Sequence, residues 1–334
     1  MMNAYTIVGG GAIGGTLAAY LVEGGAEVVI IDADHDHVAA LRERGITIQR
    51  PDGELVVRVT AYHLDEAPER LEAVILAVKA QATDSAAAWI APRLSDHGWV
   101  VSAQNGLNEA TIAKHVGAER TVACFVDLFA DVIAPGVIQD GGIGAMAIGE
   151  YTGGSSERIE SLVHDLRLWG TPVISDNVEG FLWSKLAFGS MLIATALADE
   201  DMSVLIDRHR GLMAELAAEV LELTDAMGIH PEPFDAFVPS AYRATADQAE
   251  TDAATDGLVA WLATQTKTRS GIWRDLAVRK RPTEVPAQFR AMLAFGEQHS
   301  MRMPKIRRLM ELIQAIEQGE PMAETHIEEL AKVK

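Results

Sequence analysis

Residues 5–32 read YTIVGGGAIGGTLAAYLVEGGAEVVIID, and this stretch decides the fold. An apolar strand at 5–8 runs into Gly9, Gly11 and Gly14, which fit the pattern G-x-G-x-x-G, and residues 12–22 have helical spacing. A second buried strand at 27–31 ends next to Asp32. A strand, a glycine-rich turn, a helix and a second strand in this order predict a parallel βαβ unit.

Each glycine has its own function in such a turn. Gly9 permits the tight turn, Gly11 leaves room for a pyrophosphate, and Gly14 lets helix and strand pack closely. The start of the helix, at Ala12 and Ile13, offers free N–H groups to phosphates. We therefore predict a dinucleotide site at these five residues rather than a plain tight turn.

Asp32 lies about 20 residues beyond the glycines, where a ribose-binding acid is expected. A carboxylate accepts both hydroxyls of a ribose diol and repels a 2′-phosphate, so NAD is favoured over NADP. NADP stays open, because Arg42 or Arg44 could fold back to a 2′-phosphate. Residues 34–37 read Asp-His-Asp-His. We interpret Asp34 as a helix cap before a solvated first turn, and expect no metal.

The rest of the first half alternates between strand-like and helix-like segments. Strands are expected at 46–49 and 55–60 (a hairpin around Asp52 and Gly53), 73–78, 99–102, 121–125 and 145–148. Helices are expected at 35–44, 81–91 and 155–168. This alternation predicts an α/β fold in which residues 1–175 form an N-terminal Rossmann domain with a doubly wound sheet.

The second half loses the strand-like segments. Helices are expected at 203–227, with Ser203 as the cap, at 242–265, and from Pro304 to about 317 as the final helix. Residues 176–334 are therefore predicted to form an all-α C-terminal domain for substrate binding and dimerisation.

The composition excludes several classes of protein. The 334 residues carry 28 Lys and Arg against 48 Asp and Glu, a net charge of −20, which argues against nucleic acid or an anionic membrane surface as partner. Cys124 is the only cysteine, which excludes an intrachain disulfide and a multi-cysteine zinc site. Residues 1–8 show no secretory signal, and the apolar stretch 186–198 is too short to span a bilayer. We expect a cytoplasmic protein.

Positive charge is concentrated in residues 267–308, which hold 11 Lys and Arg against 3 Asp and Glu. This basic segment is either a solvated helical face or a local surface that holds cofactor phosphates or a substrate carboxylate.

Two polar residues follow successive predicted strands. Lys79 comes directly after 73–78, and Asn105 follows 99–102 within Gln104-Asn105-Gly106. A solvated strand end and an Asn-Gly turn are the plain interpretations. Because both residues fall at the carboxyl edge of the sheet, where ligands bind in doubly wound folds, their coincidence favours a site.

Two charged residues of the second half are further candidates. Lys185 lies in an otherwise apolar helix, where it either extends to the surface or faces a cleft that would lower its pKa into the range for proton transfer. Glu284 is either a helix cap or a carboxylate that binds substrate.

These motifs together resemble those of the ketopantoate reductase (2-dehydropantoate 2-reductase) family. The matching motifs are Gly9-x-Gly11-x-x-Gly14, Val78-Lys79-Ala80, Gln104-Asn105-Gly106, Trp183-x-Lys185-Leu186, and Asp275 with Thr283-Glu284-Val285. The resemblance covers nearly the whole chain. It implies a Rossmann domain, a helical domain, an active site between them, and hydride transfer between nicotinamide C4 and a 2-oxo or 2-hydroxy carbon.

The resemblance also implies individual roles. Lys185 would be the general acid and base, Lys79 and Asn105 would orient cofactor and substrate, and Glu284 would accept a hydrogen bond from a substrate hydroxyl. Ser270 falls where the family carries a substrate-contacting serine.

The chain departs from the family pattern near Lys185 and after the second strand. The family usually has asparagines four and eight residues after the catalytic lysine, where this chain has Gly189 and Ile193. It often has a basic residue for NADP where this chain has Asp32. A site without the two amides suits a polar substrate less well. We therefore predict a divergent member that acts on a larger or more apolar hydroxy or oxo compound.

Three functional hypotheses follow. The first is an NAD(P)-dependent oxidoreductase, NAD preferred, that interconverts a secondary alcohol and a ketone, with a homodimer as the expected assembly. The second is authentic ketopantoate reduction with NADPH. The third is a non-enzymatic NAD(H)-binding regulator that kept the fold without the chemistry.

Overall fold

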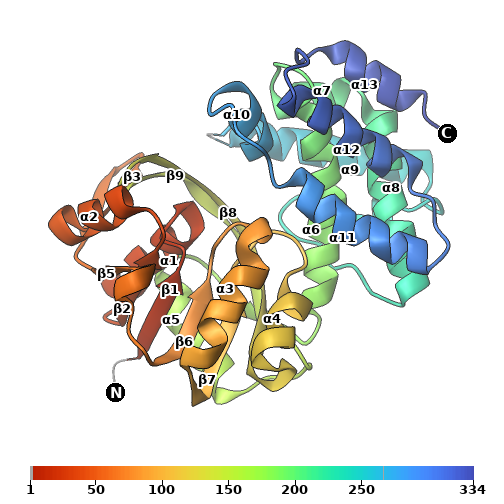
Figure 1. Ribbon diagram of the computed structural model, residues 1–334. Coiled ribbons are helices and arrows are strands. Elements are labelled where there is room, and N and C mark those ends of the chain that lie inside the picture. The colour runs from red at the N-terminus through yellow and green to blue at the C-terminus, as the bar shows by residue number, and fades with distance from the viewer. Residues whose placement is uncertain (1–2, 266) are drawn as a thin grey trace. The chain divides into compact units, whose positions relative to one another are not determined.

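The computed structural model describes residues 3–265 and 267–334, which pack as two units, Met1–Val178 and Glu179–Lys334 (Figure 1). The first unit contains a sheet covered by helices, and the described residues of the second form helices without strands. The predicted fold class, a Rossmann sheet followed by an all-α part, is confirmed.

The described residues of the first unit form one sheet of ten strands in the order β4-β3-β9-β8-β7-β6-β1-β2-β5, with β10 paired to β9. The strands are β1 (Ala4–Val8), β2 (Glu27–Asp32), β3 (Ile46–Arg50), β4 (Gly53–Val57), β5 (Thr60–His63), β6 (Leu71–Leu76), β7 (Leu94–Ser102), β8 (Thr121–Ala134), β9 (Val137–Glu150) and β10 (Val173–Ile174). From β5 through β2, β1, β6 and β7 to β8 all neighbours are parallel. Strands β2 and β5 lie on one side of β1, and β6 lies on its other side, which creates a topological switch point between β1 and β6.

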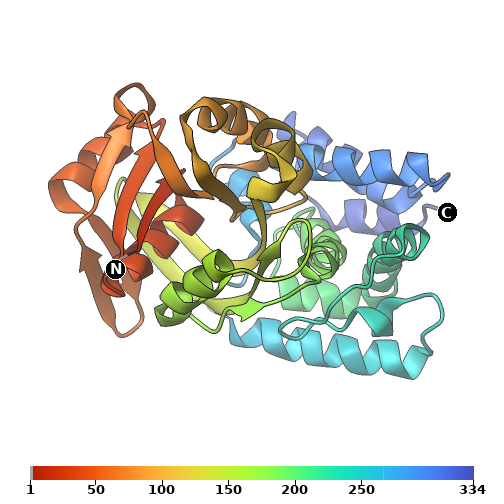
Figure 2. The ribbon, with the colours of Figure 1, turned by 90° about the horizontal axis from the view of Figure 1, so that it is seen from below.

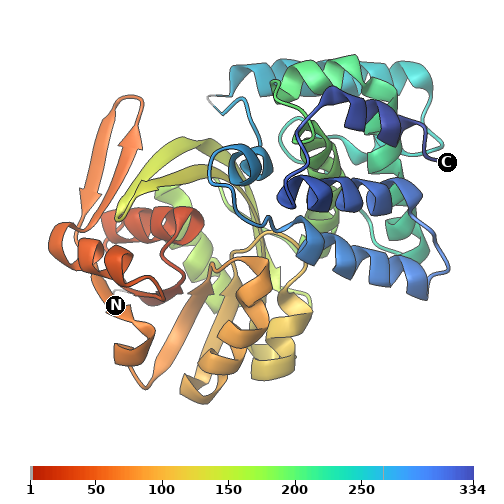
Figure 3. The same cartoon turned by 45° about the horizontal axis from the view of Figure 1, so that its top comes forward.

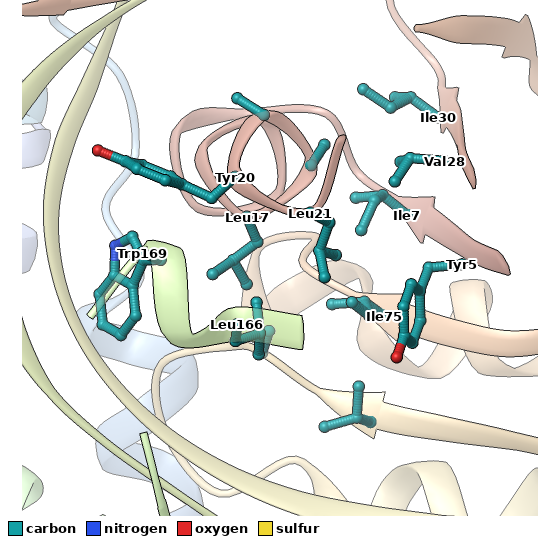
Figure 4. Close-up of a cluster of buried hydrophobic side chains, with 14 of the residues drawn as sticks. Tyr5, Ile7, Leu17, Tyr20, Leu21, Val28, Ile30, Ile75, Leu166 and Trp169 are labelled. Atoms are coloured by element: carbon teal, nitrogen blue, oxygen red, sulfur yellow. The ribbon is translucent and has the colours of Figure 1, made fainter. Parts of the chain in front are cut away.

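Helices cover both faces of this sheet because two separate sets of apolar side chains need burial. On one face α1 (Ala12–Glu23), α2 (His35–Arg44) and α5 (Glu157–Asp165) close a core that includes Ile7, Leu17, Leu21, Leu166 and Trp169 (Figure 4). On the other face α3 (Thr83–Ile90) and α4 (Glu109–Val116) bury Ile90 and Ile112 against Val74 and Leu76. Full burial of each such side chain contributes roughly 1.5–3 kcal/mol to the stability of the fold.

Several strands of the first unit differ from expectation. The expected strand 55–60 is divided between β4 and β5, and the short runs at 121–125 and 145–148 belong to the longer β8 and β9, which pair in antiparallel fashion. The outer part of β8 is only partly buried, so its apolar pattern is weak. The expected hairpin around Asp52 and Gly53 is confirmed as β3–β4, and β3 lies beside β9 (Figure 3).

The second unit is built around α6, which Figure 2 views along its axis with other helices of this unit on several sides. Trp183 of α6 makes an edge contact with Phe295, and Phe188 contacts Phe234, Phe237 and Trp261. The helices are α6 (Val178–Thr195), α7 (Met202–Arg208), α8 (Arg210–Met227), α9 (Gln248–Thr264), α10 (Gly271–Ala277), α11 (Val285–Gln298), α12 (Pro304–Glu317) and α13 (Glu324–Ala331).

The single helix expected at 203–227 is wrong. The helix is interrupted at His209, whose backbone (φ −116°, ψ 33°) ends α7 and precedes α8. Arg208 and His209 both bind the carboxylate of Glu324 on α13 (2.8 and 2.7 Å), a contact 115 residues away that holds the break. Ser203 lies inside α7, whose N-cap is Asp201.

Other helix ends are partly as expected. The helix expected at 242–265 begins later, at Gln248, because Asp247 caps it by accepting the N–H of Glu250 (2.8 Å). The helix from Pro304 to Glu317 is confirmed, but α13 follows it, so it is not the final one.

Candidate functional site

The glycine turn of the first unit has a backbone that two of its glycines make possible. Gly9 adopts φ +98°, and a Cβ there would come 2.9 Å from the backbone of Ala77 and Val78. A Cβ on Gly14 would lie 2.0 Å from the carbonyl oxygen of Gly9. Fold geometry alone therefore accounts for these two glycines.

Gly11 is different, because among the described residues, apart from its two neighbours in the chain, no atom lies within 4 Å of the place where its Cβ would stand. Its φ of −67° is open to any residue, so neither packing nor backbone conformation requires glycine here. Gly11 is also the N-cap of α1, and it has no side chain that could cap the helix. The first N–H groups of the helix, at Ala12 and Ile13, therefore remain available to another acceptor. A space reserved next to a helix N-terminus fits the pyrophosphate of a dinucleotide.

Asp32 is tied to the glycine turn. Its Oδ2 accepts the N–H of Gly10 (2.7 Å), and its Oδ1 accepts the N–H of Asp34 (2.9 Å). A carboxylate offers about four acceptor positions, so two remain for a ribose diol. The side chain is partly exposed, which leaves it accessible from solvent.

Of the two arginines that could have served a 2′-phosphate, Arg42 is held by other partners, and Arg44 makes only longer contacts. Arg42 donates from Nε to the carbonyl oxygen of Ala61 (2.8 Å) and pairs through Nη2 with Glu66. Arg44 lies near Glu43 and the carbonyl oxygen of Pro135, at 3.4 Å from each. A contact with a 2′-phosphate would require Arg42 to leave these partners.

His37 is a component of the turn that the sequence interpretation missed. Asp34 caps α2 by accepting the N–H of His37 (3.0 Å), as predicted, but the first turn is not uniformly solvated, because His37 is buried. Its Nδ1 accepts the N–H of Gly136 (3.2 Å), so Nε2 carries the proton and donates to the carbonyl oxygen of Gly10 (2.9 Å). The position of His37, five residues after Asp32 on a helix facing the turn, was the available signal.

Lys79 and Asn105 follow adjacent strands. β6 and β7 are parallel neighbours, and β6 also pairs with β1. The segments bearing Lys79 and Asn105 therefore leave the same edge of the sheet as the glycine turn and Asp32. Both side chains are partly exposed, whereas the neighbouring Gln104 points inward and is buried.

In the second unit, Lys185 belongs to a narrow stripe on a buried helix. Between residues 180 and 195 of α6 every side chain is buried except Phe181, Lys185, Gly189 and Leu192. These four recur at helical spacing and share one face. Apart from adjoining residues and the backbone of α6 itself, no atom of the described residues lies within 4 Å of where a Cβ on Gly189 would stand, so there is open space one turn beyond Lys185. Ile193 flanks the stripe and is buried.

Ser270 and Glu284 both stand at helix starts. Ser270 is buried and its Oγ caps α10 by accepting the N–H of Trp273 (3.2 Å). Glu284 is the N-cap of α11, and its Oε2 accepts from Nε2 of Gln288 (3.3 Å). The preceding Thr283 donates its N–H and its hydroxyl to Oε1 of Glu317, each at 2.7 Å, which fixes the backbone next to Glu284.

Much of the basic segment 267–308 is neutralised by nearby acids. Arg279 and Arg281 share the buried carboxylate of Asp275 at 3.2 and 2.8 Å. Arg269 lies 3.0 Å from Asp201 and over the ring of Trp273. Three more of its basic residues form ion pairs, namely Lys305, Arg307 and Arg308. These contacts favour a solvated, internally paired surface over a dedicated anion site.

The described residues, 3–265 and 267–334, contain no group of three or more His, Cys, Asp and Glu side chains placed to hold a metal ion. Among the same residues, no helix is long and apolar enough to cross a membrane.

Comparison with known proteins gives one consistent family. Residues 5–153 match the model "Ketopantoate reductase PanE/ApbA" and residues 177–317 match "Ketopantoate reductase PanE/ApbA C terminal". The chain is 26% identical over 315 residues to the 2-dehydropantoate 2-reductase of Halobacterium salinarum, covering 92% of this chain and 96% of that protein.

Solved structures show the same fold. A PanE/ApbA family ketopantoate reductase from Ralstonia eutropha is 23% identical with a TM-score of 0.78, covering 94% of this chain and 98% of the other. D-mandelate dehydrogenase with NADH and anilino(oxo)acetate is 21% identical with a TM-score of 0.79, covering 94% and 98%.

Proposed function

Because the chain belongs to the ketopantoate reductase family and is an NAD(P)-dependent oxidoreductase of that type that acts on CH–OH groups, we propose that Lys185 is its general acid and base and that its substrate is larger or more apolar than ketopantoate. The observation that carries the proposal is the stripe on α6, where Lys185 is the one ionisable side chain and Gly189 leaves open space beside it.

The first unit holds the nicotinamide cofactor in this proposal. The N–H groups at the start of α1 bind the pyrophosphate in the space left by Gly11, and Asp32 accepts the ribose hydroxyls with its two remaining acceptor positions. Lys79 and Asn105 orient the nicotinamide half and the substrate. The bound cofactor supplies or accepts the hydride at nicotinamide C4.

Lys185 handles the proton. When a carbonyl carbon gains hydride, negative charge develops on its oxygen, and the Lys185 ammonium stabilises that charge and then donates a proton to it. In the oxidative direction the neutral amine takes the hydroxyl proton while the carbinol carbon loses hydride. Glu284 accepts a hydrogen bond from a substrate hydroxyl and so fixes its orientation.

The proposed substrate class follows from what α6 presents. Gly189 and Ile193 offer no hydrogen bond to a small polar substrate, and Phe181 and Leu192 add apolar surface to the same stripe. A site with these side chains gains little from a compact hydroxy acid and more from a compound with apolar bulk. The D-mandelate dehydrogenase of this fold binds NADH with anilino(oxo)acetate, so the fold is compatible with an aromatic ligand.

NAD is the proposed cofactor. Asp32 supports it by its charge, and the contacts of Arg42 with Ala61 and Glu66 support it because that cation is held away. Authentic ketopantoate reduction with NADPH is a second candidate, favoured by the names of the curated relatives, of which the Halobacterium salinarum protein is one. Efficient NADPH-dependent turnover of ketopantoate would refute the proposed substrate and cofactor and support this second candidate.

The test combines a substrate panel with a lysine variant. The protein is assayed with NAD across secondary alcohols of rising apolar bulk, by NADH absorbance, and with ketopantoate and both reduced cofactors. Lys185→Ala is expected to bind NADH unchanged while turnover falls by about 10²-fold or more. Lys114→Ala, an exposed lysine on α4, is the matched control and is expected to keep full activity. Turnover that survives in Lys185→Ala would refute the role given to Lys185.

A homodimer is the proposed assembly, as the commonest closed arrangement of identical chains. Sedimentation equilibrium gives the mass directly, and a species of 36.0 kDa at micromolar concentration would rule the dimer out.

A further inference from the structure

The segments that carry Lys79 and Asn105 are joined by Gln104, a side chain only 2% exposed. Its Nε2 donates to the carbonyl oxygen of Val78 (2.8 Å) and to Oγ1 of Thr83 (2.8 Å). Val78 immediately precedes Lys79, so one amide just beyond β7 holds the backbone just beyond β6.

The chain of hydrogen bonds continues from Thr83 to the other segment. The Thr83 hydroxyl, having accepted from Gln104, donates to Oδ1 of Asn108 (2.9 Å). Nδ2 of Asn108 then donates to the carbonyl oxygen of Asn105 (2.9 Å). The order of donors and acceptors is consistent throughout, because Gln104 donates, Thr83 relays and Asn108 donates again.

Burying these polar side chains costs free energy of folding unless each one finds a hydrogen-bond partner. Thr83 and Asn108 are 2% and 5% exposed, so each of these polar groups must be satisfied inside the protein. Apolar residues of the same volume would fill the space without this requirement, but they would not fix the two carbonyl groups. What the network adds is a defined position for the two backbone segments that follow β6 and β7.

We propose that Gln104, Thr83 and Asn108 are positioning residues that hold Lys79 and Asn105 in the geometry needed for hydride transfer. The inference rests on the proposed function, which gives Lys79 and Asn105 their roles. The three residues touch neither cofactor nor substrate and act through the backbone of Val78 and Asn105. Because transfer depends steeply on geometry, a small displacement of these segments slows the chemical step more than it weakens binding.

Thr83→Val tests this directly, because valine keeps the shape and removes both the donor and the acceptor. We expect kcat to fall roughly tenfold to a hundredfold while the Kd for NADH changes less than threefold. Thr83→Ser restores the hydroxyl and is expected to recover most of kcat. Thr224→Val is the matched control, since Thr224 is equally buried but donates to Leu221 within α8 of the second unit, and its kcat is expected to stay at the wild-type value.

A double-mutant cycle separates positioning from general loosening. In a background that carries both Lys79→Ala and Asn105→Ala, Thr83→Val is expected to lower kcat less than twofold further, because both groups that the network positions are already gone. If Thr83→Val fails to fold, Gln104→Glu supplies the same comparison, since it keeps the shape and loses both donors. Unchanged kcat in Thr83→Val, or effects that multiply independently in the cycle, would overturn the inference alone. A wild-type protein without NAD(P)-dependent turnover would overturn the proposed function and the inference with it.

Discussion

The N–H of Gly10 donates to Oδ2 of Asp32 across 2.7 Å, so the acid that would select the cofactor also holds the turn that would bind its phosphates. Replacing Asp32 by alanine therefore changes two properties at once, the charge near the ribose and the shape of the glycine turn. A variant that separates them must keep an acceptor for Gly10.

Asp32→Asn meets that condition, because its amide oxygen still accepts from Gly10 while the negative charge is lost. We expect the preference for NADH over NADPH to shrink by roughly tenfold or more, since a like charge no longer faces the 2′-phosphate. Fluorescence titration of both reduced cofactors measures the ratio of Kd values. Asp36→Asn, at an exposed position of α2, is the control. An unchanged ratio would show that Asp32 does not face the ribose.

Gly11→Ala and Gly14→Ala should behave oppositely. The methyl group at position 11 enters open space, so the free energy of unfolding stays within about 0.5 kcal/mol of wild type while the Kd for NADH rises at least tenfold. The methyl group at position 14 meets the carbonyl oxygen of Gly9 and costs about 1–3 kcal/mol or more. Urea unfolding and cofactor titration of both variants provide the four values. Wild-type affinity in folded Gly11→Ala would mean that no ligand occupies this space.

His37→Leu removes a bridge between two backbone groups. The carbonyl oxygen of Gly10 and the N–H of Gly136 lose their shared partner, which is expected to cost about 1–3 kcal/mol of unfolding free energy and to weaken NADH binding through the turn. Thermal unfolding and NADH titration of the variant give both effects. His97→Leu, at an exposed position on β7, serves for comparison. A loss of stability with unaltered NADH affinity would limit His37 to a structural role.

Tyr5 should make the first unit sensitive to alkali. Burial and the neighbouring Asp165, which accepts its hydroxyl (2.8 Å), raise the pKa of Tyr5 well above its usual value. The unfolded chain then releases this proton at about pH 10 while the folded chain retains it, so the contribution to stability is complete below pH 10 and is lost above it. From pH 10 to 11.5 the wild type should lose up to about 1.4 kcal/mol per pH unit more than Tyr5→Phe. The measurement is the free energy of unfolding in urea as a function of pH. Parallel curves for the wild type and Tyr5→Phe would contradict the role given to Tyr5.

The parts of the fold that could be predicted from sequence are those set by local pattern. The turn at residues 9–14, the helix after it and the helix begun by Pro304 each depend on neighbouring residues, and their bounds agree with expectation. The break at His209 depends instead on Glu324, more than a hundred residues away, and no local signal announces it. Similarly, β10 and the outer half of β8 exist because β9 pairs with them.

The candidate site divides in the same way. Gly9, Gly11, Gly14 and Asp32 follow a known spacing, and the structure adds the reason why Gly11 differs from its two neighbours. His37 escaped notice because burial, which decides its function, depends on contact with Gly136 from a distant hairpin. The charge of residues 267–308 is visible in the sequence, but its pairing with Asp275, Asp201 and other acids depends on how the chain folds.

The stripe on α6 also bears on how such an enzyme diverges. Every other side chain between residues 180 and 195 is buried in the interior, so substitutions there lower the stability of the fold. If Lys185 is kept for the chemistry, Phe181, Gly189 and Leu192 are the partly exposed positions of this stretch, where a substitution disturbs the interior less. A change of substrate can then accumulate at three positions while the fold around them stays intact.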